Sequence, residues 1–78
     1  MSNEDIYNAA FAESFNIVNR DLNSLEYQSI DDWDSVGHMI LISAIESKFN
    51  IFMDPEDILD FTSYKKGIDI LHKYGIDL

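Results

Sequence analysis

Residues 35 to 50 constrain the fold of this chain more than any other segment. Their apolar positions recur at helical spacing, at Val36, Met39, Ile42, Ile45 and Phe49. The β-branched residues in this run would also suit a strand, but its length and spacing favour a helix. The apolar face is broader than a surface helix of a small protein needs. We therefore expect a helix over residues 35–50 that organises the core.

Spacing and capping signals predict three further helices. Apolar residues that share one helix face predict a helix over residues 3–18, and they are Tyr7, Phe11, Phe15 and Val18. Asp54 followed by Pro55 is typical of an N-cap and a first helical residue, and predicts a short helix over residues 55–60. A last helix is expected over residues 63–74, with Gly75 as its stop. Residues 19–34 lack periodicity and predict a long loop.

These helices fit one all-α domain over residues 1–78. The simplest arrangement that buries their apolar faces is a four-helix bundle with a long loop between the first two helices and a short third helix. A chain of 78 residues is near the lower limit for folding on an apolar core alone. Its hydrophobic content of 46% is nevertheless too high for a disordered chain.

The charge of the chain narrows the classes of partner. A formal net charge of -10 would repel nucleic acid and anionic membranes, and favours proteins with basic faces. The N-terminus lacks the basic start and apolar core of a signal peptide, and no apolar run approaches membrane-spanning length. We expect a cytoplasmic monomer that neither binds nucleic acid nor inserts into a membrane.

The chain has no cysteine, which excludes disulfides, thiolate metal sites and a thiol nucleophile of its own. Any thiol chemistry must therefore come from a cofactor.

The pair Asp34-Ser35 stands immediately before the apolar helix. Both residue types accept hydrogen bonds from free amides at a helix start, and capping is their ordinary use. An EF-hand loop would place Asp32, Asp34 and Gly37 at its first, third and sixth positions, but Ser43 stands where a bidentate glutamate is required. We therefore expect no metal site here.

A serine hydrolase is also a poor match to this pair. The Gly-x-Ser-x-Gly elbow is absent, because Trp33 occupies the place of its first glycine. His38 and His72 are the only imidazoles, and the sequence gives no preference between an exposed His38 and one that contacts a partner. We expect a protein that is not an enzyme.

A longer pattern continues from this pair. After Asp34-Ser35-Val36 come an apolar run with a glutamate and a phenylalanine, an acid-rich stretch with the short helix, and the turn Phe61-Thr62-Ser63-Tyr64. The matching positions of the run are Met39, Leu41, Ile42, Ala44, Ile45, Glu46 and Phe49. In type and spacing this order, from Trp33 to about Leu71, resembles the acyl carrier protein family.

The resemblance implies a bundle of acyl-carrier type in which Ser35 carries a 4'-phosphopantetheine arm through a phosphodiester. A phosphopantetheinyl transferase would add the arm from coenzyme A with magnesium, and Asp34 would help it bring metal and serine together. The sulfur of the arm would hold an acyl group as a thioester. The other implied partners are an acyl- or aminoacyl-activating ligase and an acyltransferase or synthase.

The family can shelter its cargo inside the bundle, and Ile42, Ile45 and Ile58 are candidates to line such a cleft. For any single one of these residues, ordinary core packing is the more usual role.

The surface charge departs from that of fatty acid carriers, whose second helix is typically acid-rich. Here the acids lie before the helix, at Asp31, Asp32 and Asp34, and after it, at Asp54, Glu56 and Asp57. We expect these acids to steer a basic enzyme. Val36, Met39 and Ile40 would make the central docking contact.

This departure favours a specialised biosynthetic pathway over bulk fatty acid synthesis. Two other interpretations of the function remain open. Gly37, two residues after the serine, is similar to D-alanyl carriers, so aminoacyl or peptidyl loading ranks second. In the other, Ser35 only caps the helix of an unmodified acidic interaction module.

Overall fold

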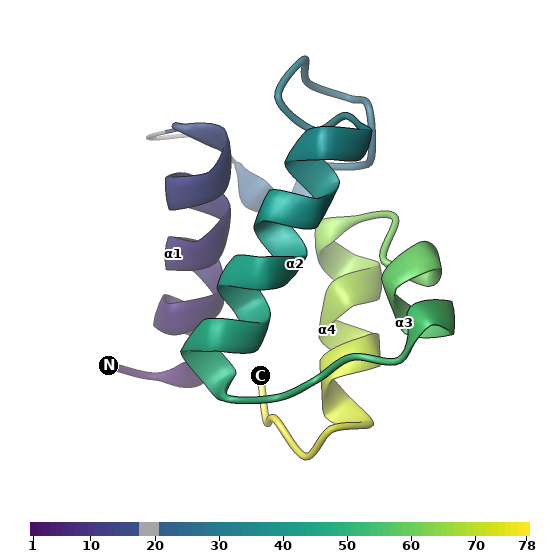
Figure 1. The fold of residues 1–78 in the computed structure, drawn as a ribbon. Coiled ribbons are helices and arrows are strands. Elements are labelled where there is room, and N and C mark those ends of the chain that lie inside the picture. The colour runs from purple at the N-terminus through teal and green to yellow at the C-terminus, as the bar shows by residue number, and fades with distance from the viewer. Residues whose placement is uncertain (18–20) are drawn as a thin grey trace.

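The computed structural model describes residues 1–17 and 21–78, and this part of the chain forms four α-helices, one short 3-10 helix and no β-strand (Figure 1). The elements are α1 (Asn3–Phe15), the 3-10 helix η1 (Leu22–Ser24), α2 (Ser35–Phe49), α3 (Pro55–Asp60) and α4 (Tyr64–His72). The prediction of an all-α chain with a short third helix is thus confirmed. No helix in the described ranges is long and apolar enough to cross a membrane.

The helix ends differ from the prediction by a few residues. α1 ends at Phe15 instead of residue 18, because Asn16 adopts a left-handed conformation with φ of 50°. Val18 lies outside the described residues. At the other end of the chain, Ser63 is the N-cap of α4, and its hydroxyl accepts a hydrogen bond from Lys66 N at 2.9 Å. α4 ends at His72, two residues before its predicted end.

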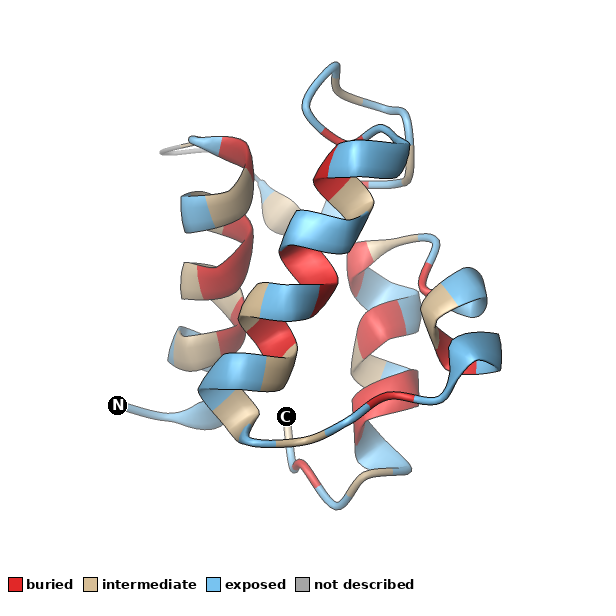
Figure 2. Cartoon of the chain, viewed as in Figure 1, coloured by how far each residue is buried: buried red, intermediate tan, exposed pale blue. Residues whose placement is uncertain are grey.

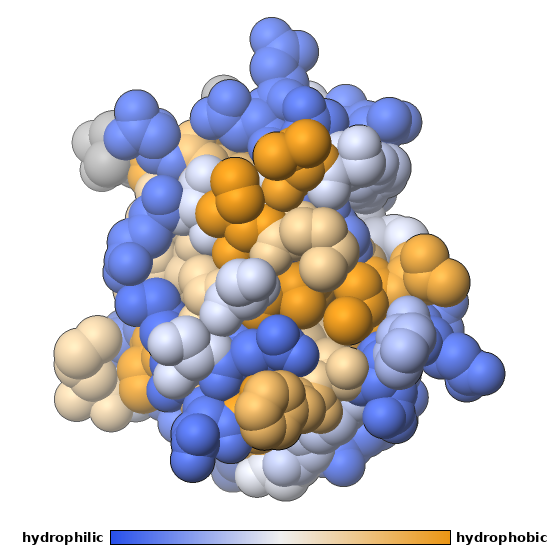
Figure 3. Space-filling view, viewed as in Figure 1, coloured by the Kyte–Doolittle hydropathy of each residue, from blue (hydrophilic) through white to orange (hydrophobic). Residues whose placement is uncertain are grey.

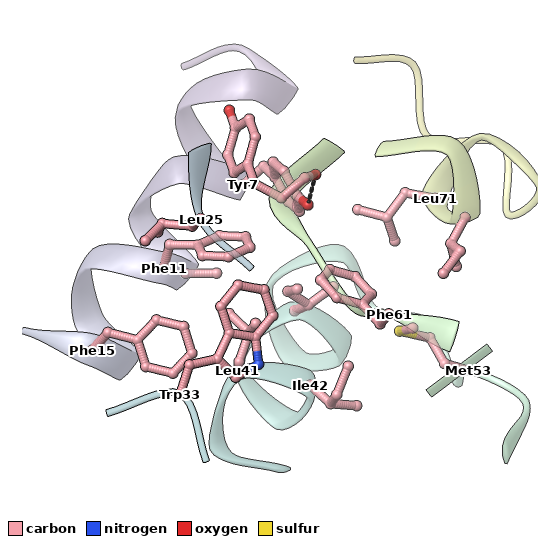
Figure 4. Packing of buried hydrophobic residues seen from close by; sticks show 14 of the residues in the cluster. Tyr7, Phe11, Phe15, Leu25, Trp33, Leu41, Ile42, Met53, Phe61 and Leu71 are labelled. Carbon is pink, nitrogen blue, oxygen red and sulfur yellow. Dashed lines mark hydrogen bonds between the residues drawn. The ribbon is translucent and has the colours of Figure 1, made fainter. Parts of the chain in front are cut away.

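An aromatic cluster between α1 and the loop before α2 forms the centre of the core (Figure 4). The rings of Phe15 and Trp33 are stacked at 5.3 Å, and Phe11 meets Trp33 edge-on at 5.6 Å. Each of these three side chains is at most 1% exposed. Such rings supply most of the apolar area that a chain this short can bury.

Tyr7 links this cluster to α4. Its hydroxyl donates a hydrogen bond to the backbone oxygen of Tyr64 at 2.7 Å. Burial raises the pKa of the Tyr7 hydroxyl well above its usual range, so the group remains a donor. Gly67 allows the close approach, because a Cβ there would lie 2.2 Å from Tyr7 Oη and 2.3 Å from Phe61 Cζ.

The long loop before α2 is held by backbone hydrogen bonds to the turn before α4. Tyr27 N donates to Thr62 O at 2.8 Å, and Tyr64 N donates to Leu25 O at 3.0 Å. Trp33 then anchors the end of the loop in the core with no exposed area. The loop is therefore built into the fold, and it fixes where α2 begins.

Along its whole length, α2 has a buried inner face and an exposed outer face (Figure 2). Leu41, Ile42 and Ile45 face the interior and are at most 1% exposed. Val36, Met39 and Ile40 lie on the outer face and are 68%, 49% and 51% exposed. The broad apolar face predicted for this helix thus consists of a core stripe and a separate exposed patch.

Candidate functional site

The first turn of α2 carries the candidate site. Asp34 is the N-cap, and its Oδ1 accepts a hydrogen bond from Gly37 N at 2.8 Å. Its backbone oxygen accepts from His38 N at 2.7 Å. Ser35 is the first helical residue and is exposed. The capping interpretation therefore applies to Asp34, while the Ser35 side chain stands at the surface.

Gly37 lets the preceding loop cross close to this turn. A Cβ on Gly37 would lie only 1.8 Å from the backbone oxygen of Asp32, and 3.3 Å from Asp34 Oδ1. No side chain fits at that distance. The glycine that resembled those of D-alanyl carriers thus has a steric reason in this fold, which is independent of the cargo.

His38 lies three residues after Ser35 on α2 and connects this helix to two other parts of the chain. Trp33 Nε1 donates a hydrogen bond to His38 Nδ1 at 3.0 Å, and His38 Nε2 lies 2.7 Å from the backbone oxygen of Ile58 in α3. An indole N–H can only donate and a carbonyl can only accept, so Nδ1 is the acceptor and Nε2 carries the proton. The imidazole is therefore neutral, with a defined tautomer.

Two grooves begin at Ser35. The outer one, of about 560 Å³, is lined by Ser35, Val36, Met39, Ile40 and Ser43. The inner one, of about 350 Å³, lies between α2, α3 and the loop, and is lined by Tyr27, Ser35, His38, Met39, Ile58, Leu59, Phe61 and Thr62. Figure 3 shows apolar side chains gathered over the upper part of α2 and toward α3, with polar residues of the loop above them.

The predicted cleft residues separate into two environments. Ile42 and Ile45 are buried among the core side chains, at 1% and 0% exposure. Ile58 is half-buried and lines the inner groove. The structure therefore does not bring the three residues together around one opening.

The predicted acidic surface also divides. Asp31, Asp32 and Asp34 are exposed and lie on the chain that leads into Ser35. Asp54 and Glu56 are exposed as well, but they lie at the start of α3, whereas the groove is lined by its last turn. These two acids are therefore not among the residues that line either groove.

Asp57 is a correction to the predicted partner surface. Its side chain is buried, with Oδ1 accepting a hydrogen bond from Lys73 Nζ and Oδ2 accepting one from the Tyr74 hydroxyl at 2.6 Å. The hydrogen bond from Lys73 is the largest cause of a lowered pKa for this carboxyl, followed by that from Tyr74. Asp57 therefore holds α3 to the end of α4 and does not face partners.

Four residues of the inner groove were not predicted as site residues: Tyr27, Leu59, Phe61 and Thr62. Leu59 carried a signal, because Ile58 and Leu59 are adjacent on a short helix and only one of them can face inward. Leu59 is 78% exposed. Tyr27 and Thr62 are joined through the backbone pairing of distant segments, which no local pattern indicates.

No family model, curated protein or solved structure matches this chain. The functional interpretation therefore rests on its own residues. Within residues 1–17 and 21–78, no three histidine, aspartate or glutamate side chains are grouped so that they could hold a metal ion.

Proposed function

We propose that this chain is a carrier protein on which Ser35 Oγ is the attachment point for a 4'-phosphopantetheine arm. One observation carries the proposal: an exposed serine is the first residue of a 15-residue helix and opens onto two apolar grooves. Such a carrier binds substrates covalently and presents them to enzymes, so the chain needs no catalytic constellation of its own.

The start of α2 suits a phosphodiester. The first amides of a helix have no internal acceptor, and the Asp34 side chain occupies that of Gly37. The amides of Ser35 and Val36 belong to the same turn, where the helix dipole also favours an anion. When bound, the arm supplies a terminal thiol for thioester formation, a group that a chain without cysteine lacks.

The surface around Ser35 suits enzymes with a basic rim and an apolar centre. Val36, Met39 and Ile40 form an exposed apolar patch, which we call the α2 patch. Asp31 and Asp32 are exposed on the loop just before this helix, within a chain of net charge -10. A few apolar anchors inside a charged rim are the usual form of a specific interface. The transferase, a loading ligase and an acceptor acyltransferase or synthase would all use this patch.

The structure supports no choice of cargo through Gly37, because that glycine is required by the Asp32 contact. The near absence of acids on α2 itself still favours a specialised pathway over bulk fatty acid synthesis. Glu46 is its only acidic residue, and its Oε2 accepts a hydrogen bond from Met53 N at 2.9 Å.

The proposal is tested by intact mass after incubation with coenzyme A, magnesium and a broad-specificity phosphopantetheinyl transferase. We expect a gain of one phosphopantetheine in the parent and none in Ser35→Ala. Ser43→Ala is the matched control, because Ser43 is an exposed serine on the same helix and lines the outer groove. It should be modified like the parent.

Absence of modification with several transferases would refute the carrier. The chain would then be an unmodified acidic interaction module, which also uses the α2 patch but keeps partner binding after Ser35→Ala. Substitution of Met39 by aspartate would abolish partner binding in either case, so Ser35→Ala is the variant that separates the two functions.

A further inference from the structure

The inner groove ends at a wall of aromatic side chains. Phe61 and Trp33 have no exposed area, and the ring of His38 lies parallel to Trp33, with a 14° angle and 6.3 Å between centroids. Tyr27 meets His38 edge-on at 5.6 Å from the loop side. The imidazole thus separates the groove from the core.

Two hydrogen bonds hold the His38 ring in this position. The bond from His38 Nε2 reaches the Ile58 carbonyl, which lies near the end of α3, where a helix leaves its carbonyls without internal donors. The bond from Trp33 Nε1 satisfies the only polar atom of a fully buried side chain. Separation of α3 from α2 at this point would leave His38 Nε2 and the Ile58 carbonyl without partners.

The space behind the wall is filled. Leu41, Ile42 and Ile45 are at most 1% exposed, and they belong to the same buried core cluster as Phe61. A well-packed interior admits an added chain only if several side chains move together. The inner groove, at about 350 Å³, is at the small end of the range of about 300–1,000 Å³ found for small-molecule sites.

We propose that His38 is a latch that keeps a group tethered at residue 35 in the inner groove and out of the core. Where the group is the arm of the proposed carrier, the inference rests on that function and narrows its cargo. The cargo is then a small group held at the surface between Met39, Leu59 and Thr62, and not a long chain sheltered beside Ile42 and Ile45.

A chemical attachment tests the latch without any transferase. Ser35→Cys creates the only thiol in the chain, which butyl or dodecyl methanethiosulfonate converts into a mixed disulfide with a short or a long alkyl chain. Methyl NMR shifts then report on the groove through Met39 and Leu59, and on the core through Ile42 and Ile45. We expect both alkyl chains to shift the groove methyls and neither to shift the core methyls.

His38→Ala in the same background should open the core. The dodecyl chain, but not the butyl chain, should then shift the methyls of Ile42 and Ile45. The exchange of the Trp33 indole N–H should rise by about tenfold, as expected for loss of one buried hydrogen bond. His72→Ala is the matched control, because His72 is the other histidine and is exposed on α4. It should behave like the parent.

A dodecyl chain that shifts Ile42 and Ile45 while His38 is present would overturn the latch, and this comparison does not depend on whether His38→Ala folds. A core that excludes the dodecyl chain equally in His38→Ala would overturn it as well. A Ser35 that no transferase modifies refutes the carrier function instead, since the alkyl chains are attached chemically.

Discussion

Replacement of Gly37 by alanine tests how the loop positions Ser35. The new Cβ would meet the Asp32 backbone oxygen at 1.8 Å, whereas ordinary contacts begin at 3.4 Å, so the loop must withdraw by about 1.6 Å. Because the obstacle is backbone, this overpacking should cost about 3 kcal/mol. The better helix propensity of alanine returns at most about 1 kcal/mol. We therefore expect a net loss of about 2 kcal/mol in the free energy of unfolding.

Urea unfolding followed by tryptophan fluorescence measures this loss. Trp33 is the only tryptophan, is fully buried and ends the displaced loop. With a slope of about 1 kcal/mol per molar urea for so small a chain, the midpoint should fall by about 2 M. Ser43→Ala adds alanine to an exposed site of the same helix and should leave the midpoint unchanged or slightly higher. A Gly37→Ala variant as stable as the parent would show that the loop does not press on α2.

Three further predictions address the site and its support. Asp34→Asn keeps a residue that caps helices well, so the free energy of unfolding measured in urea should change by less than about 0.5 kcal/mol. If the carboxylate charge serves the transferase, the modification of Ser35 measured by mass should slow at least tenfold. Tyr7→Phe removes the buried hydrogen bond to Tyr64 and should cost about 1 kcal/mol by the same assay; an unchanged midpoint would refute that contribution. For Asp57, the folded pKa is depressed below its ordinary value of 3.8, so its contribution to stability is present above that value and is lost as the pH falls through the folded pKa. Between about pH 5 and pH 3, the free energy of unfolding measured in urea should therefore fall more for the parent than for Asp57→Asn. Equal losses of this free energy would contradict the role of Lys73.

Local signals were sufficient for the helices. Asp34 and Asp54 were expected at N-caps, and they occupy the N-cap positions of α2 and α3. The exceptions are the ends of α1 and α4; at α1, apolar spacing runs on past Asn16 although the backbone there turns left-handed. Apolar periodicity is a weak guide to helix ends, because a residue just beyond the helix can still pack on the same core.

The position of Ser35 at the start of α2 and the capping role of Asp34 could also be predicted from the sequence, since both depend on neighbours within three residues. Asp57 was misplaced because its partners are 16 and 17 residues away on another helix. The role of His38 depends on Ile58, 20 residues away. An acid or an imidazole looks the same in a sequence whether it faces solvent or a buried partner, and only the packing of α3 decides between the two.

The two faces of α2 determine where the predicted cleft residues and the predicted docking residues lie. The residues that resemble a sheltering cleft, Ile42 and Ile45, belong to the stripe that holds α2 on the core. The residues that remain open, Val36, Met39 and Ile40, lie on the other side, next to Ser35. A helix that uses its inner stripe for packing has only its outer face and the α3 groove left for a tethered group. For the proposed carrier, the use of this inner stripe for packing therefore favours presentation of the cargo at the surface over storage inside.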